Sequence, residues 1–319
     1  MNLLDPTFFH TNCDYSFGDQ SGYQNGIVKI TDANIDNLEF LQKVDEIRKT
    51  GRNYMTLFID NIRLYRRENV KYTAYELVNE TAKKFKDDTI NQFFKNNDLL
   101  DLCGQMDDIN FIIFTGFEDT PIDDEIFEKI PRNVLNIFAS NAISFGGKVN
   151  PIPYGIKRKI NQFDNNQLIL KKTIDINVEP TKEVYLNYSI TNPERQTILD
   201  YFQNKTFVNI ETKKLKYSDY LNEIKKHKFV ICPDGNAIGC ECHRDWETLY
   251  MKRVPIVLDT QYLRTIFKDL PVLFVKSFFD LNENILTTNE HLVEQAKNLD
   301  LSNLDIENIF NKCVNKSII

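Results

Sequence analysis

The chain has 319 residues, of which 42% are hydrophobic and 27% charged, so it is long enough for two α/β domains with separate cores. Its formal net charge of -7 and pI of about 5.3 argue against a nucleic-acid binder, because such proteins gather Lys and Arg against phosphates. The N-terminus lacks the basic and apolar regions of a signal peptide, and no apolar run reaches the roughly 18 to 20 residues of a membrane span. We therefore expect a soluble, cytoplasmic protein whose six cysteines are reduced thiols.

The first half of the chain contains four apolar runs that predict buried strands, with one helical pattern between the first two. The predicted strands are residues 56–62, 109–116, 134–140 and 148–155, and the predicted helix is 72–85. This order predicts an α/β domain, although its pattern is less regular than that of the second half.

The second half alternates strands and helices more regularly. The predicted strands are 184–188, 206–210, 228–232, 255–258 and 270–275, and the helices between them include 194–202, 218–228 and 243–252. Asn192 is a candidate N-cap with Pro193 at the first helical position, and Ser218 is a candidate N-cap of the next helix. Such alternation predicts βαβ units in a parallel sheet.

A charged and polar stretch at 157–181 marks the domain boundary. We expect residues 1–165 to form an acceptor-side α/β domain and residues 166–319 to form a nucleotide-binding, Rossmann-like domain. Ligands of such domains bind where the strands end.

The segment 228–258 combines a strand, a glycine-bearing loop and a helix with charged residues, and it is the most informative part of the sequence. An apolar strand runs into a loop with Gly235 and Gly239, which leads into a helix that carries Arg244 and Glu247. Backbone N–H groups of such a loop and the helix dipole favour a diphosphate, and an arginine adds a bidentate contact. Glu247, one turn after Arg244, has the chemistry to accept hydrogen bonds from two ribose hydroxyls, although an ordinary i, i+3 surface pair of the two residues explains the same spacing.

This segment resembles the donor-binding signature of exostosin-like glycosyltransferases. The matching residues are Cys232, Pro233, Gly235, Arg244, Trp246, Glu247, Leu249, Pro255, Ile256 and Val257. The chain departs from the family pattern at Thr248, Lys252 and Arg253, where small residues are usual. The resemblance implies the GT-B architecture, two Rossmann-like α/β domains facing a central cleft. It also implies a hexosyl- or pentosyltransferase that moves sugar from a nucleoside diphosphate sugar to a hydroxyl of a glycan or glycoconjugate.

A second stretch, residues 184–198, resembles the first strand and loop of the same nucleotide-binding domain. The resemblance directs Asn187, Ser189 and Arg195 toward the donor phosphates. An ordinary turn into a helix, with Arg195 solvated, explains the same residues. The donor-binding residues that we expect are Asn187, Ser189, Arg195, Pro233, Asp234, Gly235, Asn236, Gly239, His243, Arg244 and Glu247.

Two residues are expected to act in catalysis. Asp119 follows the strand 109–116, where a carboxylate is placed to deprotonate an acceptor hydroxyl, although the same residues read equally well as a solvated acidic loop. Arg244 is expected to stabilise the leaving diphosphate. The resemblance implies a GT-B enzyme, a type that typically needs no bound metal, and the cysteines near His243 fit no common zinc spacing. We therefore expect the sugar nucleotide as co-substrate and neither metal nor other cofactor.

Two other function classes compete with this interpretation. A Rossmann-type dehydrogenase or epimerase would carry Gly-x-Gly-x-x-Gly after its first strand, and the chain has none. A non-catalytic nucleotide- or carbohydrate-binding protein on a transferase fold stays open, because a fold does not grant activity.

Overall fold

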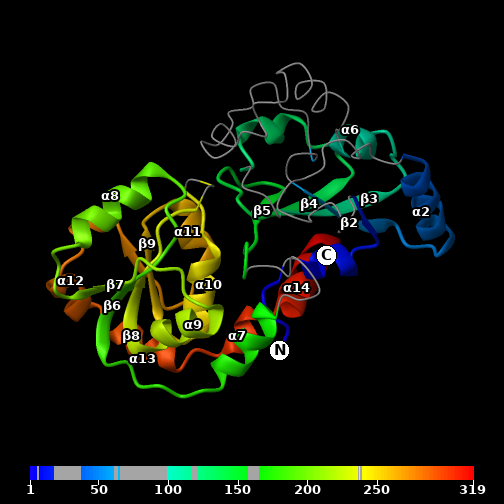
Figure 1. Cartoon of the computed structure of the whole chain (residues 1–319). Helices are drawn as coiled ribbons and strands as arrows, with labels where there is room; N and C mark the ends of the chain where they lie inside the picture. The colour runs from blue at the N-terminus through cyan, green and yellow to red at the C-terminus, as the bar shows by residue number, and fades with distance from the viewer. Residues whose placement is uncertain are drawn as a thin grey trace. The chain divides into compact units, whose positions relative to one another are not determined.

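The computed structural model describes residues 1–5, 7–17, 37–60, 64, 99–116, 121–156, 165–235, 237 and 239–319. Asp119, Asn236 and the predicted helix 72–85 lie outside the described residues. The chain divides into two compact units (Figure 1). The first comprises residues 4–154 and 306–319 with Asn2, and the second comprises residues 155–305 with Met1 and Leu3. Within the described ranges, every helix is too short or too polar to cross a membrane.

Both units are α/β, and the described residues of each form a parallel sheet of five strands. In the first sheet the spatial order β1-β2-β3-β4-β5 follows the chain. The strands are β1 (Tyr15–Ser16), β2 (Tyr54–Asp60), β3 (Asn110–Gly116), β4 (Val134–Ala139) and β5 (Val149–Pro151). The helices are α1 (Thr7–Asn12), α2 (Asn37–Lys49), α6 (Leu99–Gly104), η4 (Asp124–Glu128) and α14 (Ile306–Ile318). The four strands predicted here are confirmed, whereas β1 is too short to show a periodic pattern.

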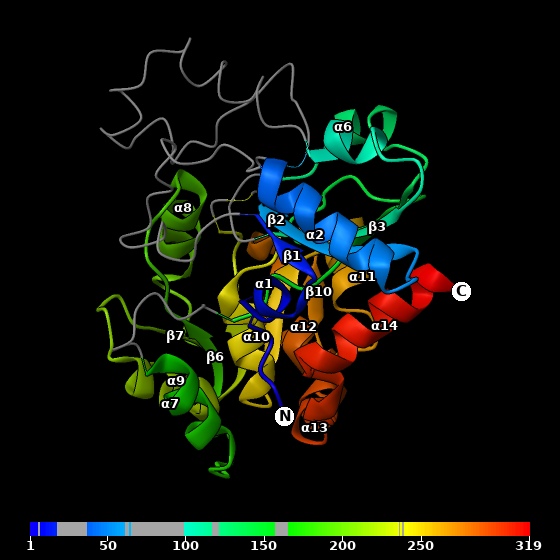
Figure 2. The same cartoon turned by 90° about the vertical axis from the view of Figure 1, so that its right-hand side faces the viewer.

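Aromatic rings build the core on both faces of this sheet. Phe40 of α2 lies 6.2 Å from Phe111 of β3, measured between ring centroids. Phe114 points to the opposite face, because side chains alternate along a strand, and lies 5.0 Å from Phe9 of α1 and 4.9 Å from Phe310 of α14. Helices α1 and α14 contact each other on that face (Figure 2).

The last helix of the chain therefore belongs to the first sheet, whereas the sequence had placed residues 166–319 together in the C-terminal domain. Polar contacts add to the aromatic ones. Lys316 Nζ donates to Asn150 Oδ1 at 2.7 Å, and Asn136 Nδ2 donates to Ser317 Oγ at 3.0 Å. The physical reason is burial, because the apolar face of β3 and β4 needs a cover that α1 alone is too short to supply.

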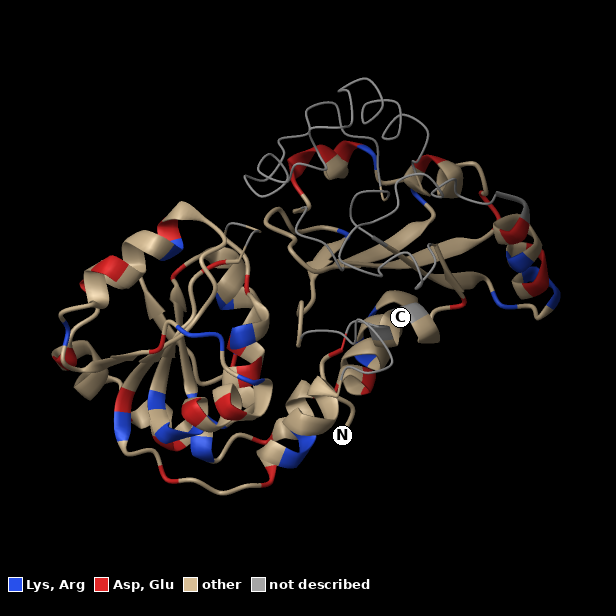
Figure 3. Ribbon diagram, viewed as in Figure 1, with Lys and Arg blue, Asp and Glu red and all other residues tan. Residues whose placement is uncertain are grey.

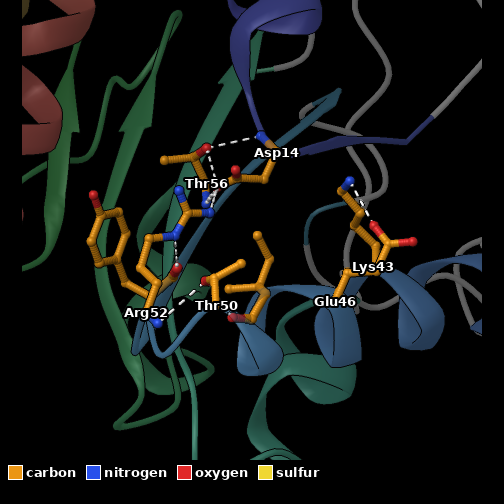
Figure 4. A network of polar contacts seen from close by, with 8 residues as sticks. Asp14, Lys43, Glu46, Thr50, Arg52 and Thr56 are labelled. Carbon is orange, nitrogen blue, oxygen red and sulfur yellow. Dashed lines mark hydrogen bonds and ion pairs between the residues drawn. The ribbon is translucent and has the colours of Figure 1, made fainter.

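A compact polar network fastens the short strand β1 to β2 (Figure 4). The carboxylate of Asp14 accepts hydrogen bonds from the backbone N–H and the hydroxyl of Thr56, at 2.7 and 2.8 Å. The Thr56 hydroxyl oxygen accepts from the Asp14 N–H at 2.9 Å, and Arg52 pairs with the same carboxylate at 2.5 Å. These contacts hold an outer strand that has only two ladder positions.

The second sheet has the order β10-β9-β8-β6-β7. Its strands are β6 (Lys182–Leu186), β7 (Val208–Ile210), β8 (His227–Ile231), β9 (Val254–Leu258) and β10 (Leu273–Val275). From β6 the chain moves outward to β7, then returns past β6 to β8 and continues in the other direction. The connections thus reverse between the neighbours β6 and β8, and in open parallel sheets this is where ligands bind, beyond the carboxyl ends of the strands.

Helices cover both faces of the second sheet (Figure 1). They are α7 (Asn166–Ile174), α8 (Pro193–Phe202), α9 (Tyr217–Lys226), α10 (His243–Tyr250), α11 (Gln261–Ile266), η5 (Phe278–Asp280), α12 (Glu283–Thr288), α13 (His291–Lys297) and η6 (Leu301–Leu304). Ile198 of α8 and Leu286 of α12 share one core cluster with Val184 and Leu186 of β6. Acidic and basic residues are interspersed along the helices of this unit, including α10 (Figure 3).

The predicted elements of this half are confirmed, with two findings at helix starts. The side chain of Asn192 accepts from the Arg195 N–H, and Pro193 is the first helical residue, as predicted. The prediction of Ser218 as an N-cap was wrong. Helix α9 begins at Tyr217, so its N-cap is Lys216, two residues before Ser218, and the Ser218 hydroxyl contacts Asp219 instead.

Asn133 provides a test of the first unit. Its side-chain amide is buried and donates to the carbonyls of Cys103, Met106 and Ile109 at 2.8, 2.7 and 3.1 Å. Asn133→Ala removes these three hydrogen bonds, although the Cys103 carbonyl keeps the Met106 N–H as a donor, and should lower the free energy of unfolding by about 1 to 3 kcal/mol in urea titrations. Asn110→Ala, which removes one exposed bond to Asn53, should stay within about 0.5 kcal/mol. Equal effects of the two substitutions would contradict this account.

Candidate functional site

The loops that follow β6 and β8 lie together at the carboxyl edge of the second sheet, which we define as the edge where its strands end. Residues 187–192 follow β6, and residues 232–242 lead from β8 into α10. Asn192 Nδ2 donates to the Gly235 carbonyl at 3.0 Å and so joins the two loops directly. Both loops stand at the point where the strand order reverses.

Arg195 is the main fastening between these loops. Its Nε donates to the Asp234 carbonyl at 2.8 Å, its Nη2 to Pro233 at 3.2 Å, and its Nη1 to the Ser189 carbonyl at 3.0 Å. The alternative of a solvated Arg195 is wrong, because the residue is 6% exposed. Burial lowers the pKa of its guanidinium, and its bonds go to carbonyl dipoles. Three of its five N–H groups are thus committed to protein structure.

Arg244 contacts the same tyrosine ring as Arg195 but has far fewer hydrogen-bond partners. It is the second residue of α10 and is partly buried. Within the described ranges its buried Nε has no hydrogen-bond partner and it forms no ion pair, while its Nη1 contacts Cys242 Sγ at 3.9 Å. Burial is the largest single influence on the pKa of Arg244 and lowers it. Several nearby groups, Tyr220 and Cys242 among them, together raise this pKa by more than burial lowers it, so the side chain stays protonated.

Both guanidinium groups lie against one aromatic ring. Tyr188, which follows β6, has its ring centroid 5.4 Å from Arg195 Cζ and 5.5 Å from Arg244 Cζ. Two like charges around one ring repel each other, and the Arg244 charge lowers the pKa of Arg195 after burial, its main cause. A buried cation is costly unless an anion or strong dipoles compensate it. The arrangement therefore favours a bound anion next to Arg244.

The glycine-bearing loop holds its own buried carboxylates. Gly239 adopts the left-handed conformation, with φ of 81°, and its N–H donates to Asp234 Oδ2 at 2.6 Å. Asp245 closes a capping box by accepting from the Cys242 N–H, also at 2.6 Å. Burial raises the pKa of Asp234 to about 6 and that of Asp245 to about 7, so near neutral pH Asp234 stays mostly ionised and Asp245 carries a reduced negative charge.

Glu247 has a different environment from the one expected of a surface residue. It is 5% exposed, and its two oxygens accept from separate tyrosine hydroxyls, Oε1 from Tyr217 at 2.8 Å and Oε2 from Tyr220 at 3.1 Å. These contacts do not fit a simple surface pair of Arg244 and Glu247. They place a buried carboxylate one helical turn from the arginine.

The remaining predicted residues occupy several positions around this edge. Asn187 donates its amide to the carbonyls of Glu211 and Lys213 at 2.6 and 3.3 Å, which ties the loop after β7 to the loop after β6. His243 Nδ1 lies 2.7 Å from the Gly155 carbonyl. Sequence reasoning missed Tyr188, Tyr217 and Tyr220. The i, i+3 spacing of the last two at a helix start is the signal that could have found them.

A hollow of about 830 Å³ opens at the opposite, amino edge of the same sheet. The buried cations Lys225 and Arg253 line it, but they serve helix ends. Lys225 donates to the carbonyls of Ile174 and Ile176, and Arg253 donates to those of Lys225 and Val178. Helix carboxyl ends disfavour anions, so we place the candidate site at the carboxyl edge. Among the described residues, no group of three or more His, Cys, Asp or Glu side chains is placed to hold a metal ion.

Replacing Arg195 tests its role as a fastening. Arg195→Leu removes its hydrogen bonds to three loop carbonyls and should lower the free energy of unfolding by at least about 2 kcal/mol. Arg264→Leu, which removes an exposed ion pair with Asp259, is the matched control and should cost less than about 1 kcal/mol. Denaturant titrations decide between them, and an Arg195 variant as stable as the control would refute the fastening role.

Comparison of the chain with models of known protein families and with curated proteins finds no match in either case.

Proposed function

We propose that the chain is a glycosyltransferase of exostosin-like, GT-B type. It binds a nucleoside diphosphate sugar at the carboxyl edge of the second sheet and transfers the sugar to a hydroxyl of a glycan or glycoconjugate. The observation that carries the proposal is Arg244, a partly buried guanidinium whose buried Nε has no partner in the described part of the chain. It lies where the strand order reverses, which is the preferred ligand position of this kind of sheet.

In the proposed reaction, the acceptor oxygen forms a bond to the anomeric carbon of the sugar. The bond from that carbon to the diphosphate oxygen breaks, and the diphosphate keeps the electron pair. Arg244 stabilises the charge that grows on the diphosphate, which is the type of interaction that accelerates such a step. The acceptor proton passes to a base, for which Asp119 is the residue predicted from the sequence. Glu247 accepts hydrogen bonds from the ribose.

A nucleotide-binding protein without catalysis is the second candidate. Arg195 favours it, since this predicted donor ligand directs three of its five N–H groups to loop carbonyls and so serves the fold first. Release of free sugar or transfer to an acceptor, followed with a radiolabelled sugar nucleotide, separates the two candidates.

Arg244→Gln tests the proposed function. Loss of a charge-assisted hydrogen bond costs about 1.5 to 3 kcal/mol, so affinity for a nucleoside diphosphate should fall roughly ten- to hundredfold in calorimetric titrations. Turnover should fall as well, because the diphosphate charge increases in the transition state.

Lys228→Gln is the charge-matched control, since Lys228 lies at the other end of β8 and pairs with Glu183 and Glu290. It should bind nucleotide like the unmodified protein. A folded Arg244→Gln variant with unchanged affinity would remove the diphosphate from this edge.

A further inference from the structure

We infer that Tyr188 is a positioning residue, whose ring holds the guanidinium of Arg244 in place for the diphosphate of the nucleotide. The inference rests on the proposed function, because it concerns the ligand of Arg244. The resemblance of residues 184–198 gives Tyr188 no role, since it directs only Asn187, Ser189 and Arg195 toward the donor.

The side chain of Tyr188 is itself fixed in position. Its hydroxyl donates to the backbone carbonyl of Arg195 at 3.0 Å, which ties the ring to the first turn of α8. The side chain also packs against the core cluster that contains Val184 and Leu186 of β6. A ring that is held at its hydroxyl and by packing presents a surface of defined position at the carboxyl edge.

Arg244 depends on this ring more than Arg195 does. Arg195 Cζ lies 5.4 Å from the ring centroid, but three of its N–H groups donate to loop carbonyls, which hold the guanidinium without the ring. Arg244 Cζ lies 5.5 Å from the same centroid. The contact of Arg244 Nη1 with Cys242 Sγ, at 3.9 Å, is weak, because a thiol sulfur is a poor acceptor. Of these two contacts of Arg244, the ring is the stronger restraint.

A ring restrains an arginine without using its N–H groups. A carboxylate partner would accept hydrogen bonds from the guanidinium and neutralise its charge, and a diphosphate needs both the donors and the charge. The negative face of an aromatic ring attracts the whole cation, so the N–H groups stay available to phosphate oxygens. An arginine that is restrained before the ligand arrives loses less side-chain freedom on binding, which makes binding tighter.

The test removes the ring and measures binding of a nucleoside diphosphate by calorimetry, with the common base that the unmodified protein binds best. A cation–π contact changes an equilibrium by roughly two- to thirtyfold, with the larger effects at desolvated sites, so Tyr188→Leu should weaken binding about five- to thirtyfold. Tyr188→Phe keeps the ring and should bind within about twofold of the unmodified protein. In an Arg244→Gln background, Tyr188→Leu should change affinity by less than about twofold, because its effect acts through the cation.

A fully fluorinated phenylalanine ring in place of Tyr188 gives a readout that a structural role would not change. Its shape is close to that of phenylalanine, but fluorine withdraws the negative charge from the ring face. Affinity should be at least about threefold lower than in Tyr188→Phe, and this comparison also serves if the leucine variant does not fold. Equal affinities with the two rings would overturn the inference.

Tyr201→Leu is the matched control. Tyr201 of α8 packs against the same core cluster, its hydroxyl donates to the Phe279 carbonyl at 2.7 Å, and Lys205 Nζ lies 4.8 Å from its ring centroid. Its loss should leave affinity for the nucleoside diphosphate within about twofold, because these contacts lie away from Arg244.

Two results would show a merely structural role for Tyr188 and overturn the inference while the proposed function survives. One is unchanged affinity in a folded Tyr188→Leu variant, and the other is an equal loss of affinity with and without Arg244. If the unmodified protein binds no nucleoside diphosphate, or if a folded Arg244→Gln variant binds it as tightly, the inference and the proposed function both fail.

Discussion

The bond set of Arg195 is the constraint on which the candidate site depends. Parallel strands place their carboxyl ends at one edge, but they do not by themselves fix the loops that follow. Arg195, in the first turn of α8, holds carbonyls from the loop after β6 and from the loop after β8. The Arg195 guanidinium donates to backbone carbonyls, and these bonds fix the conformation of both loops. Within the described residues, no carboxylate forms an ion pair with this cation.

That fixed shape determines what Arg244 can do. The second guanidinium reaches the same tyrosine ring as the first, at 5.5 Å, and its buried Nε has no partner in the described ranges. A second positive charge beside the first is unfavourable by itself, and a bound anion would compensate it. Sites often carry such local costs, because the binding partner supplies the missing interaction. The same helix, one turn further on, presents Glu247, so one element holds a cation and a carboxylate at the distance of one turn.

Much of the second sheet follows from the sequence, because each strand is a buried apolar run that ends at a polar loop, and Asn192 with Pro193 marks a helix start by local chemistry alone. Sheet order and the partners of the charged residues do not follow. The sequence leaves Arg195 equally divided between solvent and phosphate, and the structure gives it backbone carbonyls. The sequence also does not predict that α14 packs on the first sheet, because no local pattern in residues 306–318 indicates which of the two cores they contact. The tyrosines that hold Glu247 lie about 30 residues before it, and only the folded chain brings the start of α9 to Glu247 of α10.

The central claim is that the diphosphate of a nucleotide occupies the carboxyl edge of the second sheet beside Arg244. A crystal structure of the protein with a bound nucleoside diphosphate tests it most directly. The account predicts a phosphate oxygen within about 3 Å of the Arg244 guanidinium, with the ribose toward Glu247. A nucleotide bound at the amino edge near Arg253, or held by the first unit without contact to Arg244, would contradict it.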